Sequence, residues 1–252
     1  MNTRDRQIFE LLCQHGELSV QRLSEILQVS PSSIRRYLNT LHDHPYIHRT
    51  HGGATLSYVL QYNSIPVSFP DADDAEVRAI AHRAAKLIEP GDVIGLSGGK
   101  MCTELAINLR FLENITIVTN AVNIACELVG LSGIKVMVCG GMVDPGSFEL
   151  VGQLVDKALE GIYIHKFFIG TDGLTVENGL TNHSESEAEV ARNFAAHSGQ
   201  TIVLSDHQKF KRSNLAQVIP AHKISMIITT DKTPPELLQG FCELGVKVLL
   251  AY

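Results

Sequence analysis

The chain has 252 residues, of which 44% are hydrophobic and 19% charged, and its formal net charge at pH 7 is −6. This is the composition of a water-soluble globular protein, and it excludes a disordered or fibrous chain. No apolar run reaches the length of a membrane span, and the N-terminus is polar where a signal peptide has its apolar segment. The five cysteines are scattered. We therefore expect a cytoplasmic protein without a membrane segment, a disulfide framework, a metal site or another cofactor.

Charge is distributed unevenly along the chain. Residues 1–53 contain six arginines and five acidic residues, a net charge of +1, so the remainder carries −7. A net charge of +1 is too small to hold DNA by attraction alone. Any DNA binding by this segment must therefore depend on positive charges gathered on one face.

The first 40 residues have the pattern of three helices. The first covers about residues 4–14. Ser19 and Ser30 are each expected to cap a following helix, because each is preceded by an apolar residue that can pack against another one turn into the helix. Pro31 suits the first position of the third helix. Two short capped helices joined by a tight turn predict a helix-turn-helix.

The third helix is expected to have one buried and one exposed face. Ile34, Leu38 and Leu41 recur at helical spacing and should point inward. Arginine and asparagine read guanine and adenine edges, while serine binds phosphates. We predict that the opposite face contacts DNA through Ser32, Ser33, Arg35, Arg36 and Asn39.

A basic hairpin follows these helices. Residues 46–49 predict a strand, residues 52–53 a glycine bend, and residues 55–56 a returning strand. Such a hairpin is the wing of a winged helix-turn-helix. We predict that Arg49 and His51 contact DNA from it.

Two alternatives concern the same residues. Taken alone, Arg35 and Arg36 are better explained by a solvent-exposed helix face, but the capped helices and the wing reverse this preference in favour of DNA. The other alternative is a metal sensor built from His42, His44, His48 and His51. It is weaker, because no acidic or cysteine partners stand at ligand spacing.

The helical pattern is lost after residue 57. Pro66 and Pro70 interrupt the chain, and an acidic run at residues 71–76 suits the start of a helix. We therefore assign residues 1–57 to a winged helix-turn-helix domain, 58–75 to a linker and 76–252 to a sensor and oligomerisation domain.

In this last domain short apolar runs alternate with helical patterns, which predicts a mostly parallel α/β sheet covered on both faces. The strands are expected at 93–96, 116–119, 135–138, 166–169, 201–204, 226–229 and 247–250. The helices are expected near 76–88, 102–111, 121–130, 153–160, 185–197 and 235–243.

Ligands of such sheets bind where strands end and loops lead into helices. The first such loop is Ser97-Gly98-Gly99-Lys100, placed before a helix that we expect to begin near Cys102. Glycines turn main-chain N–H groups toward an anion, and the lysine adds a full charge. The loop has neither Walker nor GxGxxG spacing. A plain strand-to-helix turn explains the glycines equally well.

Later strand ends add further candidates. Asn120 suits a ligand or a helix cap, Gly141 lies in a glycine bend, Asp172 suits sugar hydroxyls or an Asp-Gly turn, and Lys209 suits a phosphate. Each signal is weak alone. Together, anion donors and hydroxyl acceptors at successive strand ends favour a phosphorylated polyol or sugar.

Several motifs together resemble the DeoR family of bacterial transcriptional regulators over almost the whole chain. The head shares the pattern SV..L...L.VS...IRR.L..L and the tag RTHGGA at residues 49–54. The body shares TIVTN at 116–120, GTDGL at 170–174 and LSDHQKF at 204–210. The resemblance implies a sensor domain similar to ribose-phosphate isomerases, glucosamine-phosphate deaminases and CoA transferases. It also implies a phosphorylated sugar as effector, operator DNA as partner, and assembly into dimers or tetramers.

The chain departs from the family pattern at two places. Tyr37 stands where the family usually has an acidic residue. The family's phosphate loop usually reads Asp-Ser-Gly-Thr-Thr-Thr, whereas residues 97–102 read Ser-Gly-Gly-Lys-Met-Cys. Lys100 would replace hydroxyl donors with a charge.

These observations predict a repressor of a carbohydrate-utilisation operon, relieved by a phosphorylated sugar. One alternative is an isomerase or deaminase of sugar phosphates with an appended head. It needs a positioned general base. Asp172 and Asp206 are available, with Glu185 or Glu187, but no acid–base pair stands at motif spacing, so we expect no enzyme. The other alternative is a sensor of an unphosphorylated sugar.

Overall fold

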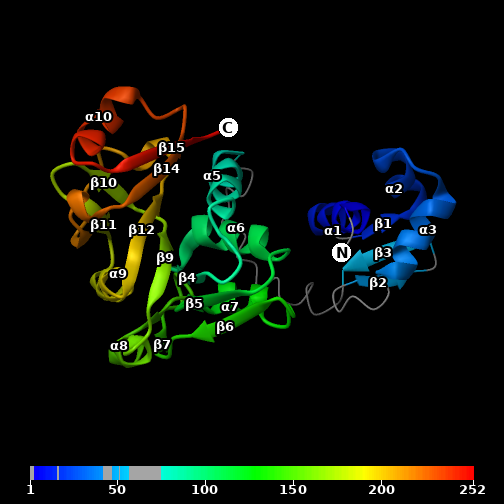
Figure 1. Cartoon of the computed structure of the whole chain (residues 1–252), viewed down its shortest axis with the longest axis horizontal. Helices are drawn as coiled ribbons and strands as arrows, with labels where there is room; N and C mark the ends of the chain where they lie inside the picture. Colours follow the sequence, from blue (N-terminus) through cyan, green and yellow to red (C-terminus); the bar gives the residue numbers. More distant parts are fainter. Residues whose placement is uncertain (1–2, 16, 42–46, 51, 57–74) are drawn as a thin grey trace. The chain divides into compact units, whose positions relative to one another are not determined.

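A computed structural model describes residues 3–15, 17–41, 47–50, 52–56 and 75–252 (Figure 1). The chain divides into two compact units, Met1–Val67 and Ser68–Tyr252. Residues 57–74 lie outside the described part, so the domain boundaries at residues 57 and 75 stay predictions.

The first unit is a winged helix-turn-helix, as predicted. Its elements are α1 (Thr3–His15), β1 (Glu17–Ser19), α2 (Val20–Leu27), α3 (Pro31–Thr40), β2 (Ile47–Thr50) and β3 (Gly53–Leu56). The strands form an antiparallel sheet in the order β1-β3-β2. Strand β1 was not expected, because three residues between two helices are too few to show the alternation of apolar and polar residues that indicates a strand.

Serine caps set the helix starts in this unit. The Ser19 hydroxyl accepts the Arg22 N–H at 3.1 Å, and the Ser30 hydroxyl accepts the Ser33 N–H at 3.3 Å. These bonds satisfy donors that the first helical turn leaves open. Ile34 and Leu38 are fully buried, as the helical spacing predicted.

The second unit is built on a seven-stranded parallel sheet in the order β15-β14-β12-β9-β4-β5-β6. Its strands are the seven predicted from sequence, so the α/β fold class is confirmed. They are β4 (Val93–Leu96), β5 (Ile115–Thr119), β6 (Ile134–Val138), β9 (Ile164–Ile169), β12 (Ser198–Leu204), β14 (Met226–Thr230) and β15 (Lys247–Ala251).

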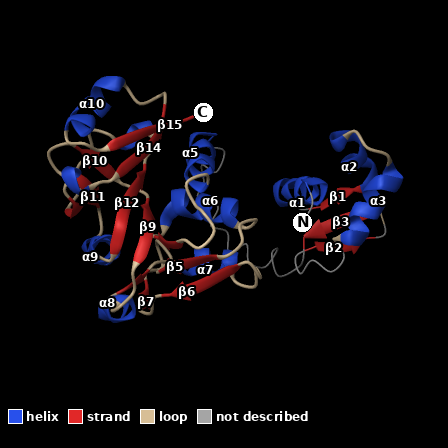
Figure 2. Cartoon of the chain, in the orientation of Figure 1, coloured by secondary structure: helices blue, strands red, loops and turns tan. Residues whose placement is uncertain are grey.

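Helices cover both faces of this sheet (Figure 2). They are α5 (Ala75–Ala85), α6 (Gly99–Leu109), α7 (Val122–Leu128), α8 (Gln153–Leu159), α9 (Glu185–Ala196) and α10 (Pro235–Glu243). Adjacent residues of the central strand β9 supply opposite cores. Phe168 packs into the core under α5, α6 and α7, and Phe167 into the core under α8, α9 and α10. This alternation is why the strand reads as a continuous apolar run.

Short elements lie outside the main sheet and were not predicted. They are β7 (Met142–Val143) with β8 (Leu150–Val151), a small sheet of β10 (Gly173–Thr175), β11 (Gly179–Asn182) and β13 (Ala216–Ile219), and the 3-10 helices η1 (His207–Lys209) and η2 (Ala221–Lys223). The dipeptide Asn178-Gly179, at the start of β11, is the signal that a hairpin prediction would have used.

Candidate DNA-binding face and effector site

The outer face of α3 presents most of the side chains predicted to contact DNA. Ser32, Arg35, Arg36 and Asn39 are exposed, whereas Ser33 is half-buried. Both serines also belong to the helix cap, because the Ser30 hydroxyl lies 2.9 Å from that of Ser32 and 3.0 Å from that of Ser33. The arginines and Asn39 are therefore the stronger candidates for contact with bases.

Tyr37 occupies the edge of this face. It is half-buried, and the Arg36 guanidinium lies 5.6 Å from the centre of its ring. A cation is attracted to the face of an aromatic ring. The residue that replaces the family's usual acid therefore holds Arg36 without neutralising its charge.

A hydrogen bond joins the wing to α3. The Arg49 guanidinium, on β2, donates to Oδ1 of Asn39. The sequence predicted both residues as DNA contacts but not this pairing. His51, the other predicted wing contact, lies outside the described residues.

Gly53 holds the wing against the rest of the head. It pairs with Ser19 across β1 and β3, and a Cβ at this position would lie 2.1 Å from the Leu18 carbonyl oxygen. Only glycine allows this approach of two backbones. Gly53 of RTHGGA is thus needed for strand packing, beyond the bend that the sequence predicted.

In the second unit, the strand order reverses between β4 and β9. The chain runs from β4 to β5 and β6 in one direction, and from β9 to β12, β14 and β15 in the other. Loops that leave two such strands diverge and open a crevice, the usual ligand site of these sheets. Ser97–Lys100 follow β4 and Asp172 follows β9, so both predicted loops leave the sheet where this rule expects a ligand.

Helix α6 begins at Gly99, three residues earlier than the sequence predicted. Gly98 is the extended cap residue, and Gly99 has a φ of +84°, which glycine adopts without strain. Gly99 and half-buried Lys100 therefore belong to the first helical turn rather than to a loop. The buried Ser97 hydroxyl lies 3.5 Å from Sγ of Cys102.

Glu149 joins two predicted loops, and sequence reasoning missed it. The side chain is buried, and Oε2 accepts a hydrogen bond of 2.8 Å from Nδ2 of Asn120. The carboxylate also accepts the main-chain N–H of Gly98. A Cβ on Gly98 would lie 2.4 Å from Cγ of Glu149, so the carboxylate fills the space that this glycine leaves. The only signal in the sequence was an acid between apolar neighbours, Phe148 and Leu150.

The surroundings of Glu149 favour its protonated form. Burial raises the pKa of Glu149 to about 7, and the negative charges of Glu187 and Asp172 act in the same direction. The hydrogen bonds from Asn120 and Gly98 oppose this rise. Near neutral pH, both protonation states of this carboxyl group are therefore populated. The ionised form only accepts hydrogen bonds, whereas the protonated form can also donate one.

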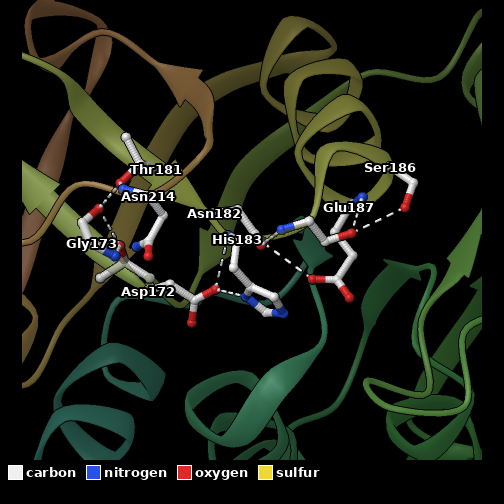
Figure 3. A network of polar contacts seen from close by, with 10 residues as sticks. Asp172, Gly173, Thr181, Asn182, His183, Ser186, Glu187 and Asn214 are labelled. Atoms are coloured by element: carbon white, nitrogen blue, oxygen red, sulfur yellow. Dashed lines mark hydrogen bonds and ion pairs between the residues drawn. The ribbon is translucent and has the colours of Figure 1, made fainter.

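Asp172, which follows β9, belongs to a polar network (Figure 3). One of its carboxylate oxygens lies 2.5 Å from Nδ1 of His183, and this hydrogen bond raises the pKa of His183. Next to it, Asn182 donates to buried Glu187 at 3.2 Å. His183 was not predicted at all, and Glu187 only as a possible base of an enzyme.

Gly141 and Lys209 are the remaining predicted effector residues. Gly141 lies next to β7, which pairs with β8 directly after Glu149. Lys209 is the last residue of η1. The next residue, Phe210, forms a β-bridge with Leu174, which lies two residues after Asp172. The structure therefore brings Gly98 and Asn120 into contact with Glu149, and it places Asp172 near enough for its charge to raise the pKa of Glu149. Gly141 lies beside the strand pair that follows Glu149, and Lys209 lies beside the residue that bridges to Leu174.

The first turn of α6 and the side chains of Lys100 and Lys209 are groups that can bind an anion. The carboxylates of Glu149 and Asp172 can accept hydrogen bonds from hydroxyl groups. Among the described residues, no group of three or more His, Cys, Asp or Glu side chains is arranged to hold a metal ion. In the same part of the chain, no helix has the length and apolar character that crossing a membrane requires.

Comparison with known proteins gives matches in both units. Residues 4–58 match the DeoR-like helix-turn-helix domain, and residues 73–231 match the DeoR C terminal sensor domain. A putative aga operon transcriptional repressor of Escherichia coli O157:H7 is 30% identical over 98% of this chain and 93% of its own length. The L-fucose operon activator of Haemophilus influenzae is 29% identical over 96% of this chain and 97% of its own length.

Among solved structures, ribose 5-phosphate isomerase A of Methanocaldococcus jannaschii aligns with 53% of each chain, at a TM-score of 0.41 and 15% identity. The matched families and the curated relatives are transcriptional regulators and not enzymes. The two family matches cover both units in order, and the sensor match alone covers more than half of the chain. The chain therefore belongs to the DeoR family of transcriptional regulators.

Proposed function

We propose that this chain represses a carbohydrate-utilisation operon and that a phosphorylated sugar relieves the repression. The names of two relatives, a putative aga operon repressor and an L-fucose operon activator, support regulation of operons of this kind.

The observation that carries the proposal is the contact between Gly98 and Glu149. It places the start of a helix, which attracts anions, beside a buried carboxyl group that can exchange hydrogen bonds with hydroxyls. The phosphate would bind at the first turn of α6, with Lys100 and Lys209 as counter-charges. Hydroxyl groups of the sugar would bind Asn120, Glu149 and Asp172.

The DNA side of the proposal uses the outer face of α3 and the wing. Arg35, Arg36 and Asn39 would enter the major groove, with Ser32 and Ser33 at phosphates and Arg49 and His51 at the wing. One head with a net charge of +1 has few phosphate contacts, so we propose that two or four copies of the chain act together on a two-fold symmetric operator. Since operators are cytoplasmic in bacteria, the proposal places the chain there.

Relief of repression requires that the sugar phosphate bind one arrangement of the protein more tightly than the other. Occupancy of the crevice between β4 and β9 would then favour the arrangement with low affinity for the operator. Equal affinity for both arrangements would leave DNA binding unchanged.

A thermal-shift screen of the full chain tests the effector. The panel contains ribose 5-phosphate, fructose 6-phosphate, glucosamine 6-phosphate and the three sugars without phosphate. We expect at least one phosphorylated member to raise the melting temperature, since a ligand of the folded state stabilises it by mass action. Lys100→Ala should abolish the shift, whereas Lys135→Ala, a matched change at an exposed lysine on β6, should keep it.

Two results would overturn the proposal. The first is a shift by an unphosphorylated sugar that Lys100→Ala leaves intact. The second is turnover of a panel member that Asp172→Asn abolishes, which would assign catalysis to the site. Retardation of the promoter fragment of the chain's own gene, reversed by the sugar phosphate that shifts the melting temperature, tests the DNA half.

A further inference from the structure

A second buried carboxylate, distant in sequence from the effector residues, lies at the start of α5. Glu76 is the second residue of that helix and is 5% exposed. Helix α5 is the first described element after residues 57–74, which connect it to the DNA-binding head. An ionised group is costly to bury unless hydrogen bonds compensate it.

Glu76 receives these hydrogen bonds from two strand ends. Its Oε1 accepts the main-chain N–H of His207 at 3.0 Å and the Thr230 hydroxyl at 2.6 Å. Its Oε2 lies 2.8 Å from Nδ1 of His207. These contacts hold the pKa of Glu76 below its ordinary value, although burial alone would raise it. The exposed Lys232 is 3.8 Å away.

The partners of Glu76 connect it to the proposed effector site. His207 opens the 3-10 helix η1, and Lys209 closes it. Thr230 is the last residue of β14, the strand beside β12 in the sheet. One carboxylate thus ties the first turn of α5 to the carboxyl ends of two neighbouring strands, at the edge of the sheet where the effector is proposed to bind.

We propose that Glu76 is a positioning residue that transmits effector binding to α5. The proposal rests on the proposed function, because it requires a phosphate at Lys209. A phosphate that draws η1 toward it displaces His207, and Glu76 passes that displacement to the first turn of α5 and to the chain leading to the head. Without Glu76, the effector still binds, but α5 does not respond.

The chain contains a matched control for this carboxylate. Asp92 is also largely buried, and it accepts bonds from Lys166 at 2.6 Å and from the Glu89 N–H at 2.8 Å, with His165 at 3.4 Å. These contacts likewise hold its pKa below the ordinary value, although burial alone would raise it. Asp92 precedes β4, so it lies at the opposite edge of the sheet from the effector residues. Asp92→Asn removes a comparable carboxylate without touching the proposed connection.

Hydrogen exchange of the full chain tests the proposal, with ribose 5-phosphate, fructose 6-phosphate, glucosamine 6-phosphate and inorganic phosphate as probes. Without a probe, Glu76→Gln and Thr230→Val should each speed exchange about tenfold in residues 75–85 and 205–211, as expected for loss of a hydrogen bond to a charged group. Thr230→Val keeps the side-chain volume and so remains informative if Glu76→Gln fails to fold. Asp92→Asn should leave both segments unchanged.

With a probe that raises the melting temperature, the unaltered chain should be protected in both segments, and the two variants only in residues 205–211. The proposal would be overturned if the probe protected α5 as strongly in Glu76→Gln as in the unaltered chain. It would also be overturned if Asp92→Asn lost the protection of α5. If none of the three sugar phosphates shifts the melting temperature, the proposed effector is contradicted instead. The exchange measured without a probe still decides whether Glu76 joins the two segments.

Discussion

The guanidinium of Arg49, on wing strand β2, donates a hydrogen bond to Oδ1 of Asn39, near the end of α3. Both side chains are exposed. The wing and the recognition helix of the head therefore share a polar contact on the face that we propose for DNA. Each side chain limits the orientations open to the other before DNA arrives.

This pairing predicts a coupled loss of DNA affinity. Asn39→Ala and Arg49→Ala should each weaken operator binding by about 1–3 kcal/mol, the range for a side chain that reads a base. The double variant should lose less than the sum, because each single change already disturbs the other residue. Fluorescence anisotropy with labelled operator measures all three. Arg212→Ala, an exposed arginine of the sensor unit, should have no effect, and strictly additive losses would contradict the coupling.

The two glycines of the wing should respond differently to the same substitution. Gly53→Ala places a Cβ against the Leu18 carbonyl and should destabilise the head by at least about 1–3 kcal/mol, the usual cost of overpacking. Gly52→Ala meets nothing within 4 Å and should be tolerated. Hydrogen exchange of residues 17–19 and 53–56 in the full chain reports the difference. Similar exchange in both variants would show that β1 and β3 do not approach as described.

Gly98 predicts a rescue experiment at the proposed effector site. Gly98→Ala should abolish the thermal shift by a sugar phosphate, because the new Cβ collides with the Glu149 side chain. Its backbone angles suit alanine, and the three atoms nearest to the added Cβ all belong to the Glu149 side chain and are absent from alanine. The double variant Gly98→Ala/Glu149→Ala should therefore regain the melting temperature lost by the single variant. Gly140→Ala, whose nearest neighbour is 3.8 Å away, is the control. A double variant no more stable than Gly98→Ala would contradict this account.

Glu149 also predicts how stability depends on pH. Between the ordinary carboxyl pKa near 4.5 and the folded value of about 7, the folded state keeps a proton that the unfolded state has lost. Stability should therefore fall as pH rises through this window, by on the order of 3 kcal/mol, and then level off. Glu149→Gln imitates the protonated form and should remove this decline. Urea unfolding of both proteins from pH 4.5 to pH 8 gives the comparison, and parallel curves would argue against a raised pKa.

The main sheet was predictable because buried parallel strands leave a strong signal. The run around Phe167 and Phe168 is apolar on both faces, so it stands out without any partner being known. Strands β7, β8, β10 and β11 have two to four residues, too few for a periodic signal. The start of α6 was misplaced, because a glycine pair usually indicates a turn, and here it opens a helix.

The site was predictable only in part, for a different reason. Gly98, Asn120 and Asp172 follow predicted strands, and the rule for parallel sheets places them at one edge. Glu149, His183 and Glu76 act through residues far from them in sequence, such as Asn120, Asp172 and His207. Local sequence patterns carry no information about such pairings, so these residues were identified only from the structure.

The adjacency of β4 and β9 also sets the order in which the protein becomes complete during synthesis. The head ends its last strand at Leu56, whereas the crevice needs β9, which ends only at Ile169. Domains generally fold as units, with the N-terminal one first as the chain emerges. The head that we propose for DNA binding is therefore finished while the proposed effector site is still being made.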